Sequence, residues 1–268
     1  MSRIGQKFEQ LKAAGETGLV AYVTAGDPTP ERTASIVWAL ERGGADLVEL
    51  GVPFSDPVAD GPRIQLAMDR ALAQGTSLAR VLEIAREIRT RSQIPLVLFS
   101  YLNPLLRYGF ERLADDAAAA GIDGCLITDL SVEEAEAGDW VATLNGSGLD
   151  TIFLAAPTST ARRLELVSRY STGFVYLVSR TGVTGEQRAG NIGPMVEALR
   201  RATDKPLAVG FGISTPQHAA DAARLADAVV VGSAIVRVVE EHGASPDLEA
   251  RLEEFARALK RPLRRSAQ

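Results

Sequence analysis

The amino-acid sequence predicts a closed (β/α)8 barrel, the TIM barrel, formed by residues 1–268 as a single domain. Eight short apolar runs, each long enough for one buried strand, alternate with segments whose apolar residues have helical spacing. Strands buried on both faces and separated by helices are typical of a parallel sheet, and one such barrel needs a chain of about this length. The runs span residues 19–25, 46–52, 95–102, 124–130, 151–156, 174–179, 206–212 and 228–234.

Helical patterns precede, separate and follow these runs. Near the N-terminus, Ile4, Phe8 and Leu11 have helical spacing and predict an extra helix before the barrel. A short helix is expected to begin near Ser233, directly after the eighth strand. Other helical patterns cover residues 30–44, 77–92, 110–121, 159–170 and 192–203.

Composition excludes several classes of protein. The formal net charge of −5 argues against nucleic acid or an anionic membrane as the main partner. Cys125 is the single cysteine, so the sequence predicts neither a disulfide framework nor a zinc-type cluster, and no metal site is expected. No apolar run has the length of a membrane span, and the N-terminus lacks the apolar core of a signal peptide. We therefore expect a cytoplasmic protein.

Glu49 interrupts the apolar run of the second strand. Side chains alternate across a strand, so Leu47, Glu49 and Gly51 share one face and the aliphatic residues between them share the other. Helices should cover the aliphatic face, which leaves Glu49 pointing into the barrel near its catalytic end. Poor solvation there should raise the carboxyl pKa and suit Glu49 to passing a proton in both directions. The alternative, a structural ion pair with a buried base, is less favoured because the strands offer no Lys or Arg except Arg180 at a strand end.

Asp60 lies in the loop that follows the same strand. A residue there is placed to reach over the mouth of the barrel and to act beside Glu49. The pattern "ADGP" is also a turn signal, so Asp60 as a turn former or helix cap remains an equal alternative on local grounds. Asp56 in "SDP" is better read locally as a turn residue than as a catalytic group.

Glycines gather in three neighbouring loops at the predicted catalytic face. "SRTGVTGEQ" follows the sixth strand, "GFGIS" ends the seventh and "VVVGSAIV" ends the eighth. Their exposed backbone N–H groups, together with the N-terminus of the helix near Ser233, predict a phosphate site. A single glycine often serves only a tight turn, but three adjacent glycine loops favour the phosphate interpretation.

Several motifs together resemble the tryptophan synthase α-subunit family: "VTAGDP", "VELGVPFSDPVADGP", "SYLNPLLRYG", "SRTGVTG", "GFGIS" and "VVGSAIV". The similarity runs from "FEQLKAAGE" to the C-terminal helix, with the motifs in the family's order and spacing. It implies retro-aldol cleavage of indole-3-glycerol phosphate to indole and glyceraldehyde 3-phosphate. It also implies an αββα heterotetramer with a β subunit, in which the β subunit carries pyridoxal phosphate and this chain carries no cofactor.

The resemblance also assigns roles to individual positions. Glu49 matches the general acid/base that protonates C3 of the indole, and Asp60 matches the acid that accepts the indole N–H. Glu49 is then the economical base for the glycerol hydroxyl. Thr184 falls in the loop after the sixth strand, where the family uses it to hold Asp60. The indole pocket is matched by Tyr22, Phe99, Tyr101, Leu126, Thr128, Leu154 and Tyr176; the phosphate site by Gly185, Gly212, Ile213, Gly232 and Ser233; and the β-subunit interface by Asp56, Pro57, Asn103 and Asp129.

Four positions depart from the family pattern: Tyr22, Arg63, Thr128 and Ser131. The first and third change the polarity of the predicted pocket, and the other two lie on loops predicted to face a partner. Three alternatives to the α subunit stay open. They are a free-standing indole-glycerol-phosphate lyase, a catalytically inactive activator of a β subunit, and another phosphate-binding barrel enzyme such as a phosphosugar isomerase. The intact Glu49 and Asp60 weigh against the last two.

Overall fold

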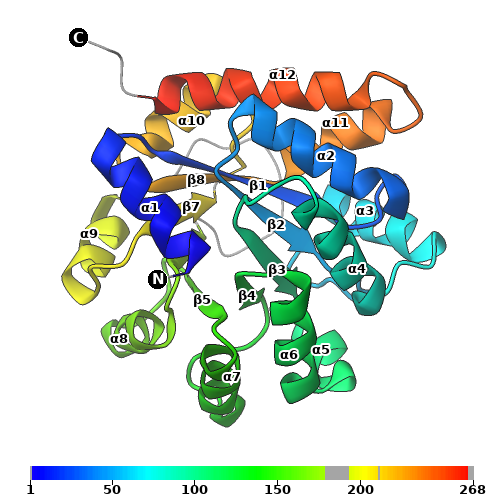
Figure 1. The fold of residues 1–268 in the computed structure, drawn as a ribbon. Coiled ribbons are helices and arrows are strands. Elements are labelled where there is room, and N and C mark those ends of the chain that lie inside the picture. The colour runs from blue at the N-terminus through cyan, green and yellow to red at the C-terminus, as the bar shows by residue number, and fades with distance from the viewer. Residues whose placement is uncertain (1, 179–192, 211, 265–268) are drawn as a thin grey trace.

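Eight parallel strands form a closed barrel in chain order, as the sequence predicted (Figure 1). The computed structural model describes residues 2–178, 193–210 and 212–264. Consecutive strands pair in parallel all the way round, and the eighth closes the ring on the first. The strands are β1 Gly18–Thr24, β2 Leu47–Gly51, β3 Leu96–Ser100, β4 Gly124–Ile127, β5 Asp150–Ala155, β6 Val175–Val178, β7 Leu207–Gly210 and β8 Ala228–Val231.

Helices surround the barrel, and α12 lies alongside α2 on its outside (Figure 1). They are α1 Arg3–Ala14, α2 Pro30–Gly43, α3 Pro62–Ala73, α4 Leu78–Arg89, α5 Leu102–Tyr108, α6 Phe110–Ala120, α7 Ala135–Gly146, α8 Ala161–Tyr170, α9 Gly193–Ala202, α10 Pro216–Ala223, α11 Ser233–His242 and α12 Leu248–Lys260, with a 3-10 turn at Arg261–Leu263. The helix predicted directly after the eighth strand is α11, which begins at Ser233 as expected and has 10 residues. Its apolar face includes Val236 and Val239, both buried, and the packing of this face stabilises the helix.

The strands separate two apolar clusters, one inside the barrel and one between the barrel and its helices. Val48, Leu50 and Val52 belong to the outer cluster. Leu47 belongs to the inner cluster. Glu49, two residues further along the strand, therefore also points inward, as the alternation predicted. Several apolar runs extend beyond the strand ends: β3 ends at Ser100 and β8 at Val231. The residues left over turn onto the rim, where a barrel places its functional groups.

The predicted N-terminal helix is α1, and it covers the end of the barrel opposite to this rim. Its residues Ile4, Phe8 and Leu11 are buried in the inner cluster. The ring of Phe8 lies 5.7 Å from that of Phe174, which directly precedes β6. The Ser2 hydroxyl caps the helix by accepting the N–H of Gly5 at 3.1 Å. The apolar face of α1 therefore packs against the interior of the barrel at this end.

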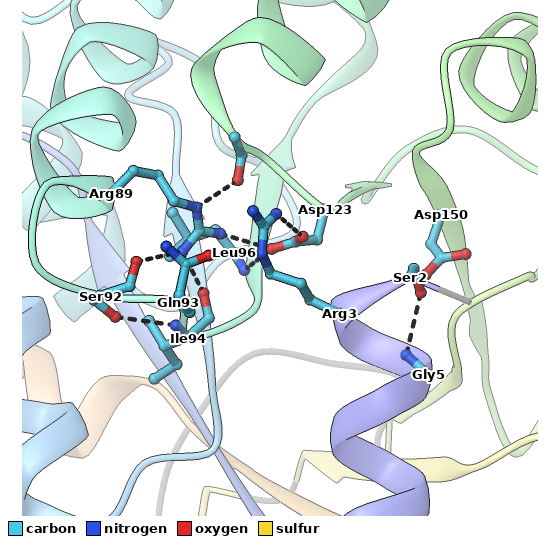
Figure 2. A network of polar contacts seen from close by, with 11 residues as sticks. Ser2, Arg3, Gly5, Arg89, Ser92, Gln93, Ile94, Leu96, Asp123 and Asp150 are labelled. Atoms are coloured by element: carbon cyan, nitrogen blue, oxygen red, sulfur yellow. Dashed lines mark hydrogen bonds and ion pairs between the residues drawn. The ribbon is translucent and has the colours of Figure 1, made fainter.

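Asp123 organises a polar network at the same end of the barrel (Figure 2). Its carboxylate accepts from Arg89 at 2.7 Å, from Arg3 at 2.8 Å and from the backbone N–H of Leu96 at 2.8 Å. The side chains of Asp123 and Arg89 are 4% and 12% exposed, so this pair is largely desolvated. The network joins α1 and α4 to the starts of β3 and β4. Its position at the N-terminal ends of the strands points to a role in stability.

Candidate active site

Glu49 lies in the third position of β2, opposite Tyr22 on β1 and Val97 on β3. The residue is 1% exposed, and neither carboxylate oxygen has a hydrogen-bond partner in the described part of the chain. Burial raises the pKa of Glu49 to about 8. At neutral pH the side chain is therefore mainly protonated, and it can act as an acid toward a group that enters the barrel.

Asp60 reaches the same mouth from the loop between β2 and α3. It is 7% exposed, and its Oδ2 accepts a hydrogen bond of 2.6 Å from the Tyr101 hydroxyl at the end of β3. The backbone N–H of Ala59 donates to the same Tyr101 oxygen at 3.0 Å. Burial raises the pKa of Asp60 to about 6, although the hydrogen bond from Tyr101 opposes that rise. At neutral pH Asp60 is therefore mainly ionised while Glu49 is mainly protonated.

Two buried tyrosines connect the carboxyl groups electrostatically. Burial and the charge of Asp60, with a smaller effect of Glu49, raise the pKa of Tyr22. Burial, then Glu49 and then Asp60 raise the pKa of Tyr176. Both carboxyl groups act on both hydroxyls, so the four side chains lie near one another, in a region that we call the chamber. Two titratable groups held in opposite states in such a chamber are the arrangement that acid/base chemistry requires.

The walls of the chamber are mostly apolar. Tyr22 and Phe99 meet edge to face with ring centroids 5.2 Å apart. The Tyr22 hydroxyl lies 3.3 Å from Thr24 Oγ1. Tyr22, Phe99 and Leu126 belong to the inner cluster, and Leu154 and Tyr176 pack against it partly buried. Aromatic and aliphatic side chains therefore predominate around Glu49.

Two of the predicted pocket residues, Tyr101 and Thr128, are not part of the inner apolar cluster. Tyr101 is fully buried, but its ring contacts Phe54 with centroids 5.3 Å apart and its hydroxyl serves Asp60. Thr128 is half-buried just after β4, where its hydroxyl donates to the Ser100 carbonyl at 3.2 Å. The sequence did not predict that Tyr101 holds Asp60. These two residues lie at the rim, outside the inner apolar cluster.

Gln65 is a site residue that the sequence analysis missed. Its side-chain amide donates to the backbone carbonyl of Asp60 at 2.8 Å and more weakly to that of Pro57 at 3.4 Å. Gln65 lies in the first turn of α3, directly after the loop it holds. An amide side chain five residues after the candidate acid, in a helix that begins with Pro62, was the available signal.

Two of the glycine loops come together at the predicted phosphate end. β7 pairs with β8 through Gly210 and Val230, which brings Gly212 and Gly232 out on neighbouring strands. Gly212 has φ +62, a left-handed conformation that favours glycine. No side chain in the described part of the chain caps the N-terminus of α11 at Gly232, which leaves the first N–H groups of the helix available to an anion. Ile213 is 2% exposed, whereas Ser233 is exposed.

The space around Gly232 can be judged from the position that a Cβ would take there. A Cβ built on Gly232 would meet Tyr22 at 3.6 Å and Ile64 at 3.8 Å, which is ordinary van der Waals contact. The described residues therefore leave room for a side chain there. Thr184 and Gly185 lie outside the described residues, so the third glycine loop stays a prediction.

The residues predicted to face a partner follow β2, β3 and β4, and Asn103 among them lies in the first turn of α5. Asp56, Asn103 and Asp129 are exposed and Pro57 is partly exposed. Asp129 accepts the backbone N–H of Leu102 at 2.7 Å, which ties two of these loops together. The apolar side chains Val58 and Leu106 on the same rim are 69% and 50% exposed. A rim that mixes polar and apolar groups in this way suits contact with another protein.

Within the described residues, no group of three or more His, Cys, Asp and Glu side chains is close enough to hold a metal ion. The helices of the same part of the chain include none with the length and apolar character needed to cross a membrane.

Comparison with known families shows to which family the chain belongs. The family model described as tryptophan synthase alpha chain matches residues 8–264. The chain belongs to the tryptophan synthase alpha chain family. The motif resemblance is thereby confirmed, and with it the role in tryptophan biosynthesis and the family's lyase activity, which cleaves indole-3-glycerol phosphate.

Full-length relatives support the assignment. The tryptophan synthase alpha chain of Solibacter usitatus is 64% identical over 97% of this chain and 98% of its own length. That of Geobacter sp. strain M21 is 51% identical over 97% of both chains. Among solved structures, tryptophan synthase subunit alpha from Legionella pneumophila has a TM-score of 0.88 at 36% identity and covers 98% of both chains. A Mycobacterium tuberculosis tryptophan synthase structure has a TM-score of 0.90 at 36% identity and covers 99% of both chains.

Proposed function

We propose that this chain cleaves indole-3-glycerol phosphate with Glu49 as general acid/base and Asp60 as a fixed anion. The observation that carries the proposal is the state of Glu49, whose buried carboxyl group has no partner among the described residues and has a pKa of about 8. A buried polar group without a partner costs stability, so its retention at the mouth of the barrel fits a group reserved for substrate.

The reaction follows from these two states. The Glu49 carboxyl group gives its proton to C3 of the indole and leaves an indolenine cation. Asp60 accepts a hydrogen bond from the ring N–H, and its charge stabilises the positive charge that develops on the ring. The Glu49 carboxylate then takes the proton of the adjacent glycerol hydroxyl. The carbon–carbon bond breaks, its electron pair returns to the ring, the C–O bond becomes a carbonyl, and Glu49 is protonated again.

The rest of the substrate has complementary surroundings. The ring is placed against Tyr22, Phe99, Leu126, Leu154 and Tyr176, with Tyr101 and Thr128 at the rim. The phosphate is placed on the backbone N–H groups of Gly212, Ile213, Gly232 and Ser233, where the dipole of α11 favours a dianion. Gly185 and Thr184 are proposed to complete the phosphate site and to hold Asp60, respectively.

We place the second half of the function in a partner protein. A β subunit would bind the rim formed by Asp56, Pro57, Asn103 and Asp129 in an αββα heterotetramer. Pyridoxal phosphate would belong to that subunit, this chain would need no cofactor, and the complex would work in the cytoplasm. Indole is a small apolar product that crosses membranes readily, so direct transfer to a second active site has a physical advantage. Order imposed on the Asp60 loop by a partner would raise the population of the closed site.

An indole-release assay with and without a β subunit tests the proposal. The isolated chain should be a weak catalyst, and the β subunit should increase its rate at least about tenfold, a coupling of about 1.4 kcal/mol. Asp56→Ala should reduce that activation with little effect on the isolated rate, because Asp56 is exposed and away from the chamber. Full activity of the isolated chain at all β-subunit concentrations would instead identify a free-standing lyase. Activation of a β subunit by a chain that releases no indole would identify an inactive activator.

A further inference from the structure

Helix α3 lies between the two ends of the proposed substrate site. It begins at Pro62, two residues after Asp60, and Gln65 in its first turn holds the carbonyl of Asp60 at 2.8 Å. Ile64 in the same turn lies 3.8 Å from the position of a Cβ on Gly232, at the start of α11. Successive residues of one helical turn therefore contact the catalytic loop and the phosphate end.

An ion pair joins α3 to α11 on the outside of this contact. Arg63 of α3 donates through Nη1 to Glu240 of α11, and the two side chains are 40% and 33% exposed. A cation in the first turn of a helix is opposed by the helix dipole, so Arg63 gains little from its own helix. Its interaction is with the neighbouring helix, which carries the proposed phosphate site at its N-terminus.

A second ion pair fixes the other end of α3. Arg70 donates two hydrogen bonds, of 2.8 and 2.9 Å, to the carboxylate of Asp27, whose side chain is 2% exposed. The charge of Glu240 also helps to raise the pKa of Arg70, after the larger effect of Asp27, so Glu240 acts on both arginines. Asp27 precedes Pro28, and the latter lies 3.0 Å from the position of a Cβ on Gly243, just beyond the end of α11. α3, α11 and the loop after β1 thus form a closed frame.

We propose that Arg63 is a positioning residue whose ion pair with Glu240 couples the phosphate-binding helix α11 to the Asp60 loop. Phosphate bound at the start of α11 would order that helix. The Arg63–Glu240 pair would pass the constraint to α3, and Gln65 would pass it to the backbone of Asp60. Binding energy from the phosphate, which does not react, is then used to place the carboxylate that stabilises the cation. The inference rests on the proposed phosphate site.

Hydrogen–deuterium exchange tests the coupling without turnover. Glycerol 3-phosphate, added to saturation, should slow exchange in peptides that cover residues 53–61 of the wild-type chain. Arg63→Ala should still bind the ligand, with affinity changed by less than about twofold, but should lose most of that protection. Arg42→Ala is a matched control, because Arg42 forms a similar ion pair, with Glu253 of α12, away from the site. Equal protection of residues 53–61 in the Arg63→Ala variant and the wild type would overturn the proposal. A wild-type chain that shows no protection there would overturn it as well.

Charge reversal separates positioning from direct attraction of the phosphate. Arg63→Ala should lower kcat about threefold, within the range of one exposed ion pair, with KM little changed. The double variant Arg63→Glu/Glu240→Arg restores the pair in the opposite orientation and should recover the wild-type kcat to within about twofold. If Arg63 acted on the phosphate directly, the double variant would bind glycerol 3-phosphate more weakly and recover nothing, which would overturn the coupling. A wild-type chain that binds the ligand but releases no indole would refute the proposed function instead.

Discussion

The Tyr101 hydroxyl holds Asp60 Oδ2 at 2.6 Å, from the end of β3 to the loop after β2. The Tyr101 hydroxyl oxygen also accepts the N–H of Ala59 at 3.0 Å, so the Tyr101 side chain fixes both the carboxylate and the backbone beside it. The donated hydrogen bond lowers the pKa of Asp60, which burial alone would raise further. Tyr101 thereby keeps Asp60 both in place and ionised.

Tyr101→Phe should remove that hydrogen bond and raise the pKa of Asp60 above its value of about 6. If ionised Asp60 is required, the acid limb of kcat/KM against pH moves to higher pH. The rate at neutral pH should fall about tenfold, because a hydrogen bond to a charged group contributes about 1.5 kcal/mol or more. Tyr108→Phe is the control. The Tyr108 hydroxyl donates to Asp116 at the same distance, 2.6 Å, but this pair lies away from the chamber. An unshifted acid limb in Tyr101→Phe would contradict this role.

Glu49→Gln should lower kcat at least about a hundredfold while substrate still binds, because the amide has no proton to give to C3. The replacement is nearly isosteric, so circular dichroism and glycerol 3-phosphate affinity should be unchanged. Retention of more than a tenth of the wild-type rate would refute the general-acid assignment.

The same substitution should change how stability depends on pH. The folded pKa of Glu49 is about 8 against an ordinary value of 4.5. Between these values the folded chain keeps a proton that the unfolded chain has lost, so the contribution of Glu49 to the free energy of unfolding falls as pH rises. Glu49→Gln removes this contribution. In urea titrations the variant should therefore gain stability relative to wild type from pH 5 to pH 8, and a constant difference would argue against the raised pKa.

Asp60→Asn should reduce kcat strongly and KM little, since the charge opposite the developing cation matters mainly in the transition state. In the wild type, kcat/KM should rise with pH as Asp60 ionises near 6 and fall as Glu49 loses its proton near 8. The variant should lack the acid limb. A change confined to KM would make Asp60 a binding residue only.

Gly232→Val should weaken the binding of glycerol 3-phosphate much more than the binding of free indole, as measured by calorimetry. Among the described residues, the nearest atoms lie 3.6 Å from a Cβ at this position, so the fold should tolerate a side chain and its thermal unfolding should change little. The added methyl groups instead displace the phosphate from the N-terminus of α11. Equal weakening of both ligands would place the phosphate elsewhere.

Asp123→Ala should destabilise the protein without impairing catalysis. The Arg89 side chain, 12% exposed, would lose its carboxylate partner, and breaking a buried pair costs about 3 kcal/mol. The network lies at the closed end of the barrel, so kcat of the folded enzyme should stay within about twofold of wild type. Asp116→Ala, an exposed acid on α6, should change stability little. A large loss of kcat in Asp123→Ala would show that the two ends of the barrel are coupled.

The sequence by itself determined the features that repeat along the chain or depend on near neighbours. Apolar runs of strand length determined the barrel, and the two-residue alternation of β2 determined that Glu49 points inward. Gly44 and Gly121 end helices in the left-handed conformation, which glycine adopts more readily than other residues. These features rest on backbone geometry within one element, which the residue types there largely fix.

Only the tertiary structure decided which side chains meet. Tyr101 and Asp60 are 41 residues apart, and Arg63 and Glu240 are 177 apart, so no local pattern carries their contact. Closing the barrel sets the strand registers, and these bring the rim loops together in one arrangement. The pKa of Glu49 depends on the same closure, because the apolar residues of the other strands, rather than its own, remove water from the carboxyl group. A residue's type and face follow from its neighbours in sequence, but its partners and its protonation state follow from packing between distant segments.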